Sequence, residues 1–277
     1  MAKVWYITGC STGFGRELCA QLLDRGDQVV ATARDRHTVV EFERSHPNQA
    51  LACAVDVTKP DQIQSSVQAG LARFGHIDVL VNNAGYGVIG AVEEVSDAEL
   101  RAMFEVNVFG VVYVLKAVLP SMRKQRSGRI LNVSSTAGHI AFPGSATYSC
   151  TKHALEGLSD GLAQELAPLG IRVTLIEPGP FRTDFAGRSI VIAKEEIADY
   201  AETAGKRRTG IKEFDGHQQG DPVLGVQAMI AIADEADPPL RLALGGPAYT
   251  MIREKLARVS AELDRWESLG KPTDYPE

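Results

Sequence analysis

Short hydrophobic runs alternate along the chain with longer stretches in which hydrophobic positions recur every three or four residues. Runs rich in β-branched residues are typical of strands buried on both faces, and the longer period is typical of helices that pack on one face. The runs predict strands at residues 4–8, 28–33, 50–55, 79–81, 129–133, 172–176 and 241–244. The periodic stretches predict helices at residues 14–25, 35–45, 60–74, 97–123, 146–167, 222–233 and 247–269.

The order of these elements predicts an α/β fold. Strands that alternate with helices form parallel sheets, so we expect one Rossmann-like, doubly wound domain with a seven-stranded parallel sheet flanked by helices. No linker, repeat or low-complexity tract interrupts the alternation, and residues 1–277 are therefore expected to form a single domain.

Two segments stand apart from the alternation. Residues 177–220 show little hydrophobic period, and so long a stretch in a compact domain is typical of a functional loop, so we expect a substrate lid at about 185–220. The closing helix, at about 247–269, carries a stripe formed by Tyr249, Ile252, Leu256, Val259, Leu263 and Trp266. Steps of three and four indicate that this stripe packs against the core or against another subunit.

Composition narrows the possible functions. Hydrophobic residues make up 44% of the 277 positions and charged residues 23%, which excludes a disordered chain. The formal net charge of −6 gives no support to a nucleic-acid partner. The longest charge-free apolar run, residues 108–115, is far shorter than the ~20 residues of a membrane span, so no membrane partner is expected.

The cysteines and the start of the chain indicate the compartment. Cys10, Cys19, Cys53 and Cys150 have neither the spacing of a CxxC pair nor a histidine at zinc-ligand distance, so we expect reduced, buried thiols and no metal site. The chain enters a strand-like run within its first residues and leaves no room for a signal peptide. We therefore expect a cytoplasmic protein.

The turn after the first strand has the composition of a phosphate cradle. It contains Gly9, Ser11, Thr12, Gly13, Phe14 and Gly15, and a helix begins within it. Glycines at such a turn let the backbone approach a pyrophosphate, whose charge is then met by N–H groups and the positive end of the helix. The turn therefore indicates a dinucleotide cofactor.

The spacing of this turn, TGxxxGxG, resembles that of the classical short-chain dehydrogenase/reductase family, and motifs farther along the chain match that family in order. Asp56-Val57 follows the third strand, Asn83-Ala84-Gly85 the fourth, and Pro178-Gly179 the sixth. The resemblance implies that the residues of the glycine turn named above hold the cofactor together with Asp56, Val57, Asn83, Ala84, Gly85, Tyr148, Lys152, Pro178, Gly179, Phe181 and Thr183.

Candidate catalytic residues lie at the other end of the motif order. Ser135 follows the fifth strand, and Tyr148 stands thirteen positions later, four residues before Lys152 on the same face of a predicted helix. A phenol is a poor base near neutrality, but a nearby ammonium favours the phenolate. The resemblance implies that Tyr148 moves the proton, Ser135 orients the substrate oxygen, Lys152 binds ribose and lowers the pKa of Tyr148, and Asn107 holds a relay water.

Two neighbouring residues bear on the choice of cofactor. Arg34 follows the second strand directly, where a guanidinium pairs well with the 2′-phosphate of NADP. Asp35 lies twenty positions after Gly15, a distance at which an acid often binds the ribose of NAD, but it is also suited to cap the next helix. We therefore favour NADP, with NAD as the alternative.

The expected reaction is hydride transfer between the nicotinamide cofactor and a carbonyl or secondary alcohol. Phe142, Phe181, Phe185 and, less directly, Tyr86 fall in segments that should border the pocket, which favours an apolar substrate. The family resemblance implies a homodimer or homotetramer formed through the helices at 97–123 and 146–167. The alternative function is a non-catalytic sensor that only binds the dinucleotide. The three-residue spacer between Gly9 and Gly13 opposes an extended-branch epimerase.

Overall fold

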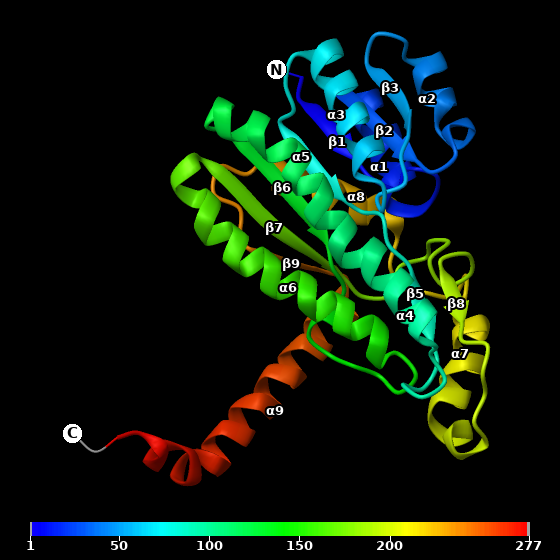
Figure 1. Ribbon diagram of the computed structural model, residues 1–277, viewed down its shortest axis with the longest axis vertical. Helices are drawn as coiled ribbons and strands as arrows, with labels where there is room; N and C mark the ends of the chain where they lie inside the picture. Colours follow the sequence, from blue (N-terminus) through cyan, green and yellow to red (C-terminus); the bar gives the residue numbers. More distant parts are fainter. Residues whose placement is uncertain (1, 276–277) are drawn as a thin grey trace.

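A seven-stranded parallel sheet runs through the computed structural model, which describes residues 2–275 (Figure 1). The strands are β1 (Val4–Ile7), β2 (Gln28–Ala33), β3 (Ala50–Ala54), β4 (Val79–Asn82), β6 (Gly128–Val133), β7 (Ile171–Pro178) and β9 (Arg241–Leu244). Their order in the sheet is β3-β2-β1-β4-β6-β7-β9. All the predicted strands and the doubly wound α/β fold are confirmed. From β1 the chain adds β2 and β3 on one side and then β4 and the later strands on the other, so the order of strand addition reverses between β1 and β4.

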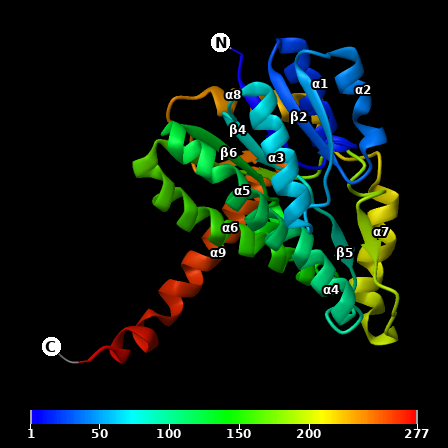
Figure 2. The ribbon, with the colours of Figure 1, turned by 45° about the horizontal axis from the view of Figure 1, so that its top comes forward.

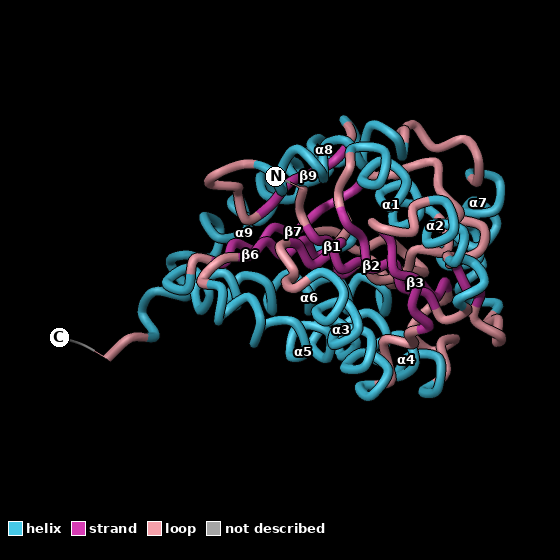
Figure 3. The backbone as a smooth tube through the Cα atoms, turned by 90° about the horizontal axis from the view of Figure 1, so that it is seen from above, coloured by secondary structure: helices cyan, strands magenta, loops and turns pink. Residues whose placement is uncertain are grey.

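Helices cover both faces of the sheet, as the view from above shows (Figure 3). One layer contains α1 (Gly13–Arg25), α2 (Val40–Ser45) and α8 (Pro222–Asp234), and the other contains α3 (Pro60–Phe74), α5 (Gly110–Gln125) and α6 (Ala146–Leu166). Side chains alternate across each strand, so Trp5 and Ile7 pack toward α1 while Val4 and Tyr6 pack toward α3. The continuous hydrophobic runs follow from this burial on both faces.

Two predicted helices are divided in the structure. Residues 35–45 form a 3-10 turn, Arg36–Thr38, which Asp35 caps by accepting a hydrogen bond from the His37 N–H, and then the short α2. Residues 97–123 form α4 (Asp97–Phe104), a π-helical segment (Glu105–Phe109) and then α5. The stretch Asp97–Gln125 is long and apolar enough to cross a membrane, but a helix that covers a sheet passes the same test.

The segment predicted as a loop at 177–220 contains regular structure. A short strand, β8 (Ile190–Ile192), pairs in parallel with β5 (Gly87–Ile89), and α7 (Lys206–Phe214) follows it. These elements and α4 gather at one end of the molecule (Figure 2). The prediction missed them because β8 is only three residues long and α7 is mostly polar.

The closing helix, α9 (Gly246–Gly270), projects away from the rest of the protein (Figure 1). Ala248 is its one buried residue, so the expectation that its stripe packs against the core is wrong. Packing against another subunit stays a prediction.

The cysteines are free among the described residues, as expected. Cys10 and Cys19 are buried, Cys53 is half-buried, and Cys150 is exposed on α6, so the expectation of a buried thiol holds for the first two and is wrong for Cys150.

Candidate active site

The glycine turn after β1 is shaped to bring backbone close to a ligand. Gly9 and Gly13 have φ values of +73° and +57°, which favour glycine over other residues. A Cβ on Gly15 would lie 2.4 Å from the carbonyl oxygen of Gly9, so only glycine fits this first turn of α1. The Asn83 amide donates hydrogen bonds to the carbonyls of Thr8 and Gly9, at 2.9 and 3.0 Å, and thereby holds the turn.

The segment that follows β7 closes over this turn. The rings of Phe14 and Phe181 meet edge to face with centroids 5.1 Å apart, and Thr183 lies beside Gly13. Beside the turn is a cavity of about 510 Å³ whose walls include Gly13, Thr183 and Asp184. Pro178 ends β7, and the Gly179 N–H donates to the Leu244 carbonyl, which fixes the point where the segment leaves the sheet. The structure thus brings the first and the last of the predicted cofactor motifs together.

The remaining cofactor candidates occupy the ends of β2, β3 and β4. Arg34 is exposed directly after β2, while the carboxylate of Asp35 is used as the cap described above. Asp56 accepts hydrogen bonds from the Thr58 N–H and hydroxyl, at 2.9 and 2.8 Å, and Val57 packs against Gly110. In the turn after β4, the Thr8 hydroxyl accepts hydrogen bonds from the N–H groups of Asn83 and Ala84.

Ser135, Tyr148 and Lys152 meet where β6 ends and α6 begins. The Lys152 ammonium donates to the Val133 carbonyl at 2.9 Å and lies 5.8 Å from the centroid of the Tyr148 ring. Ser135 begins a 3-10 turn, and its hydroxyl accepts from the Ala137 N–H at 3.1 Å. The four-residue step on α6 therefore places the phenol and the ammonium side by side, next to the serine.

The electrostatics of this group differ from the expectation in one respect. Desolvation raises the pKa of Tyr148 above its ordinary value, and an interaction with Ser135 lowers it only in part, so the expected net depression by Lys152 is not found. Burial lowers the pKa of Lys152 to about 8, against an opposing attraction from Glu156. At neutral pH the pair is therefore a neutral phenol beside a mostly charged ammonium, which suits a proton donor.

Asn107 lies in the π-helical segment between α4 and α5 and is buried. Its side-chain nitrogen donates to the Tyr86 carbonyl at 2.8 Å and to the Thr151 hydroxyl at 3.1 Å, and its oxygen accepts from the Tyr86 N–H. A Cβ on Gly85 would lie 3.2 Å from the Asn107 oxygen and 3.8 Å from the Lys152 nitrogen, so both side chains border one point of the backbone. Single-turn π segments often occur at functional sites.

Apolar side chains surround the Tyr148 ring. Phe185 lies with its ring centroid 5.8 Å from that of Tyr148, and Tyr86 packs in the same cluster, which includes Val88 and Met103. Phe142 instead lies under the guanidinium of Arg207, 5.6 Å from its ring centroid. The structure thus brings Phe185 to the phenol but places Phe142 against α7.

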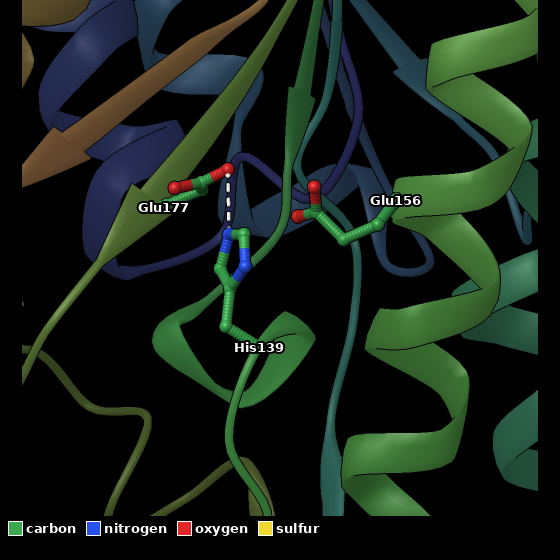
Figure 4. A group of neighbouring side chains, drawn as sticks. All are labelled: His139, Glu156 and Glu177. Atoms are coloured by element: carbon green, nitrogen blue, oxygen red, sulfur yellow. Dashed lines mark ion pairs between the residues drawn. The ribbon is translucent and has the colours of Figure 1, made fainter. Parts of the chain in front are cut away.

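A buried charged group, missed in the sequence, lies behind Lys152. His139, Glu156 and Glu177 point toward one another, and an ion pair of 3.1 Å joins His139 to Glu177 (Figure 4). Arg241 lies 3.1 Å from Glu156 and 3.6 Å from Glu177 and so supplies the positive charge that these carboxylates require. These residues come from separate elements, so no local motif reveals them. The four-residue step from Lys152 to Glu156 was the one available signal.

The hydrogen bonds of this group reach the catalytic strand. Ser134 donates to Glu156 at 2.5 Å. Interaction with Glu177 raises the pKa of His139, and burial raises that of Glu156. The group therefore supports the end of β6 and places a carboxylate near the Lys152 ammonium.

Comparisons with known proteins are consistent with this geometry. The sequence profile of the family described as short chain dehydrogenase matches residues 3–190. A short-chain dehydrogenase of known structure from Streptomyces avermitilis is 42% identical, with a TM-score of 0.93 over 99% of this chain and 100% of its own.

Two further solved structures were determined with nicotinamide cofactors. ElxO with NADP bound is 26% identical, with a TM-score of 0.73 over 90% of this chain and 100% of its own. The 3-ketoacyl-(acyl-carrier-protein) reductase from Brucella melitensis, complexed with NADH, is 29% identical, with a TM-score of 0.74 over 89% of this chain and 98% of its own.

Proposed function

Because this chain belongs to the short-chain dehydrogenase/reductase family and is thus an NAD(P)-dependent oxidoreductase, we propose that it interconverts a carbonyl and a secondary alcohol, with Tyr148 moving the proton. One observation carries this proposal: Tyr148 interacts with Ser135, and the Lys152 ammonium lies 5.8 Å from the centroid of its ring, at the end of β6. General acid–base catalysis requires such a positioned proton carrier.

The residues around the glycine turn fit a dinucleotide. The close approach at Gly15 and the positive φ values of Gly9 and Gly13 leave backbone N–H groups bare of side chains, as a pyrophosphate requires. Thr183 and the Asn83-Ala84-Gly85 turn border the path from there to Tyr148. When bound, the nicotinamide group supplies or accepts the hydride at the substrate carbon.

The proton path follows from the side chains in place. In the reducing direction, neutral Tyr148 gives its proton to the substrate oxygen, and the Ser135 hydroxyl orients that oxygen. The Lys152 ammonium stabilises the resulting phenolate. Asn107 would hold a water that returns a proton toward Lys152. Its amide donors are already used, so this water would bind the main chain or the free lone pair of its oxygen.

The substrate is proposed to be an apolar carbonyl compound or alcohol. Phe185 lies beside the Tyr148 ring, and the buried cluster of Val88, Val95 and Met103 packs behind that ring, so the surroundings of the phenol are apolar. Residues 185–220, with β8 and α7, are proposed to act as the lid, since the segment brings Phe185 to the Tyr148 ring and is joined to the rest of the protein by the pairing of β8 with β5 and the ion pair of Arg208 with Glu94.

NADP is the proposed preference, with NAD as the alternative. Arg34 is exposed at the end of β2 and available to a 2′-phosphate, whereas the Asp35 carboxylate is used as a cap. Free cysteines fit the proposed cytoplasmic location. A homodimer or homotetramer through the α4–α5 and α6 surfaces remains part of the proposal, as does the single domain.

A substrate panel tests this function. The protein is mixed with NADPH and a series of alkyl and aryl ketones and aldehydes, and with NADP⁺ and the matching alcohols, while the reduced cofactor's absorbance is followed. We expect turnover that increases with the apolar surface of the substrate and is abolished in Tyr148→Phe. Tight cofactor binding without turnover of any member would favour the sensor function instead.

A further inference from the structure

The outer part of α9 presents a row of large apolar side chains to solvent. Leu256 is 59% exposed, Leu263 69% and Trp266 56%, and a contiguous row of exposed apolar side chains marks a site of contact with another molecule. The helix is anchored to the protein only at its N-terminal end, and its other end points away (Figure 1).

The spacing of this row is that of a coiled coil. Tyr249, Leu256 and Leu263 are seven residues apart, and Ile252, Val259 and Trp266 follow each of them after three. These six residues occupy the a and d positions of successive heptads, the pattern by which two helices wind around each other. The exposed face thus has the periodicity of a two-helix seam, whereas the core-packed helices of this fold use wider stripes.

Charges beside the seam identify the partner. Arg253 and Lys255 occupy the flanking e and g positions in the first half of the seam, and Glu262 and Glu267 occupy the g and e positions in the second half. Antiparallel pairing with a second copy, in the register that places Ile252 opposite the partner's Leu263, brings Lys255 to the partner's Glu262 and Glu262 to the partner's Lys255. Parallel pairing would instead bring Glu262 to the partner's Glu267, which is repulsive.

The placement of α9 agrees with an antiparallel pair. An α-helix of 25 residues is roughly 37 Å long, so antiparallel pairing puts the two sheets at opposite ends of the pair. From the heptad spacing, the charge pattern and this geometry, we propose that α9 is a self-association helix that forms an antiparallel coiled coil with α9 of a second copy of this chain.

The first test removes the seam. Leu256→Glu combined with Leu263→Glu should halve the molar mass measured by light scattering after gel filtration, at the concentration at which the native protein is associated. Helix content and the thermal midpoint of the main unfolding transition serve as folding controls. An unchanged molar mass would overturn the proposal, and so would a native protein that shows monomer alone.

The second test exchanges charges. Lys255→Glu should raise the dissociation constant roughly tenfold or more, because two attractive contacts become repulsive, and adding Glu262→Lys should restore it. Glu254→Lys, on the far side of the helix, is the matched control and should leave association unchanged. Equal weakening in the single and the double variant would contradict the pairing of Lys255 with the partner's Glu262.

The third test determines direction. In a Cys150→Ser background, a mixture of Ile252→Cys and Leu263→Cys proteins should form a disulfide between the two variants on mild oxidation, because antiparallel seams place these positions opposite each other. Each variant crosslinked only to itself would indicate a parallel pair and overturn the proposed arrangement.

Discussion

Replacing Arg34 by alanine is expected to change which nicotinamide cofactor binds. The side chain lies directly after β2, is exposed, and has no ion pair among the residues that the structure describes. Two residues later, Arg36 donates to the Ala52 carbonyl at 2.9 Å and pairs with Glu43 at 2.5 Å. Arg34 is therefore the guanidinium available to a 2′-phosphate, and Arg36 provides a matched control with the same charge.

The size of the effect follows from one charge-assisted contact. A hydrogen bond to a charged group contributes about 1.5–3 kcal/mol, so loss of the Arg34 contact should weaken NADPH binding by roughly 10- to 150-fold. NADH lacks the 2′-phosphate, and its affinity should change little. The dissociation constants of both cofactors are measured by fluorescence titration for the native protein, Arg34→Ala and Arg36→Ala, at fixed salt because exposed charges are screened.

Either of two results would contradict this role of Arg34. Native protein that binds NADH more tightly than NADPH would show that Arg34 does not select the cofactor. If Arg34→Ala weakens the binding of NADPH and NADH equally, the side chain acts through its general charge or through the fold of the turn. Asp35 would then be the better candidate for the residue that selects the cofactor.

Two further variants test the turn and the charged group behind the site. Gly15→Ala should lower the free energy of unfolding by about 1–3 kcal/mol and abolish cofactor binding, because the added Cβ would meet the Gly9 carbonyl. Gly157→Ala, in open space on α6, is the control and should not destabilise the protein. Denaturant titration and NADPH binding are measured for both variants. Glu156→Gln removes an attraction that raises the pKa of Lys152. In a pH profile of the reduction rate, the fall on the alkaline side, expected near pH 8, should therefore move to lower pH. An unchanged profile would contradict the influence of Glu156 on Lys152.

Much of the fold could be predicted because it rests on local patterns. The strands buried on both faces are continuous hydrophobic runs, so β1, with four buried residues, is clear without any knowledge of its neighbours. The strand β8 is only three residues long and is defined by its pairing with β5, about a hundred residues earlier in the chain, so no local pattern could indicate it.

In the candidate site, too, the features that depend on neighbouring residues could be predicted, and those that depend on distant segments could not. The Tyr148–Lys152 pair depends on one helical step, and the structure places the two side chains together. The pKa of Tyr148 depends on how much water its surroundings exclude, and those surroundings come from Phe185 and Ile190 in a distant segment. The expectation of a lowered pKa failed because a nearby ammonium was visible in the sequence and the desolvation was not.

The Tyr148 hydroxyl is proposed to carry the proton, whereas most of the cofactor is held by other residues. The most direct measurement compares kcat on a turned-over substrate and the dissociation constant of NADPH in the native protein and in Tyr148→Phe. We expect a fall in kcat of about 10²–10⁴-fold or more, with NADPH affinity nearly unchanged, because only the hydroxyl is removed. A Tyr148→Phe protein that keeps near-native kcat would contradict it.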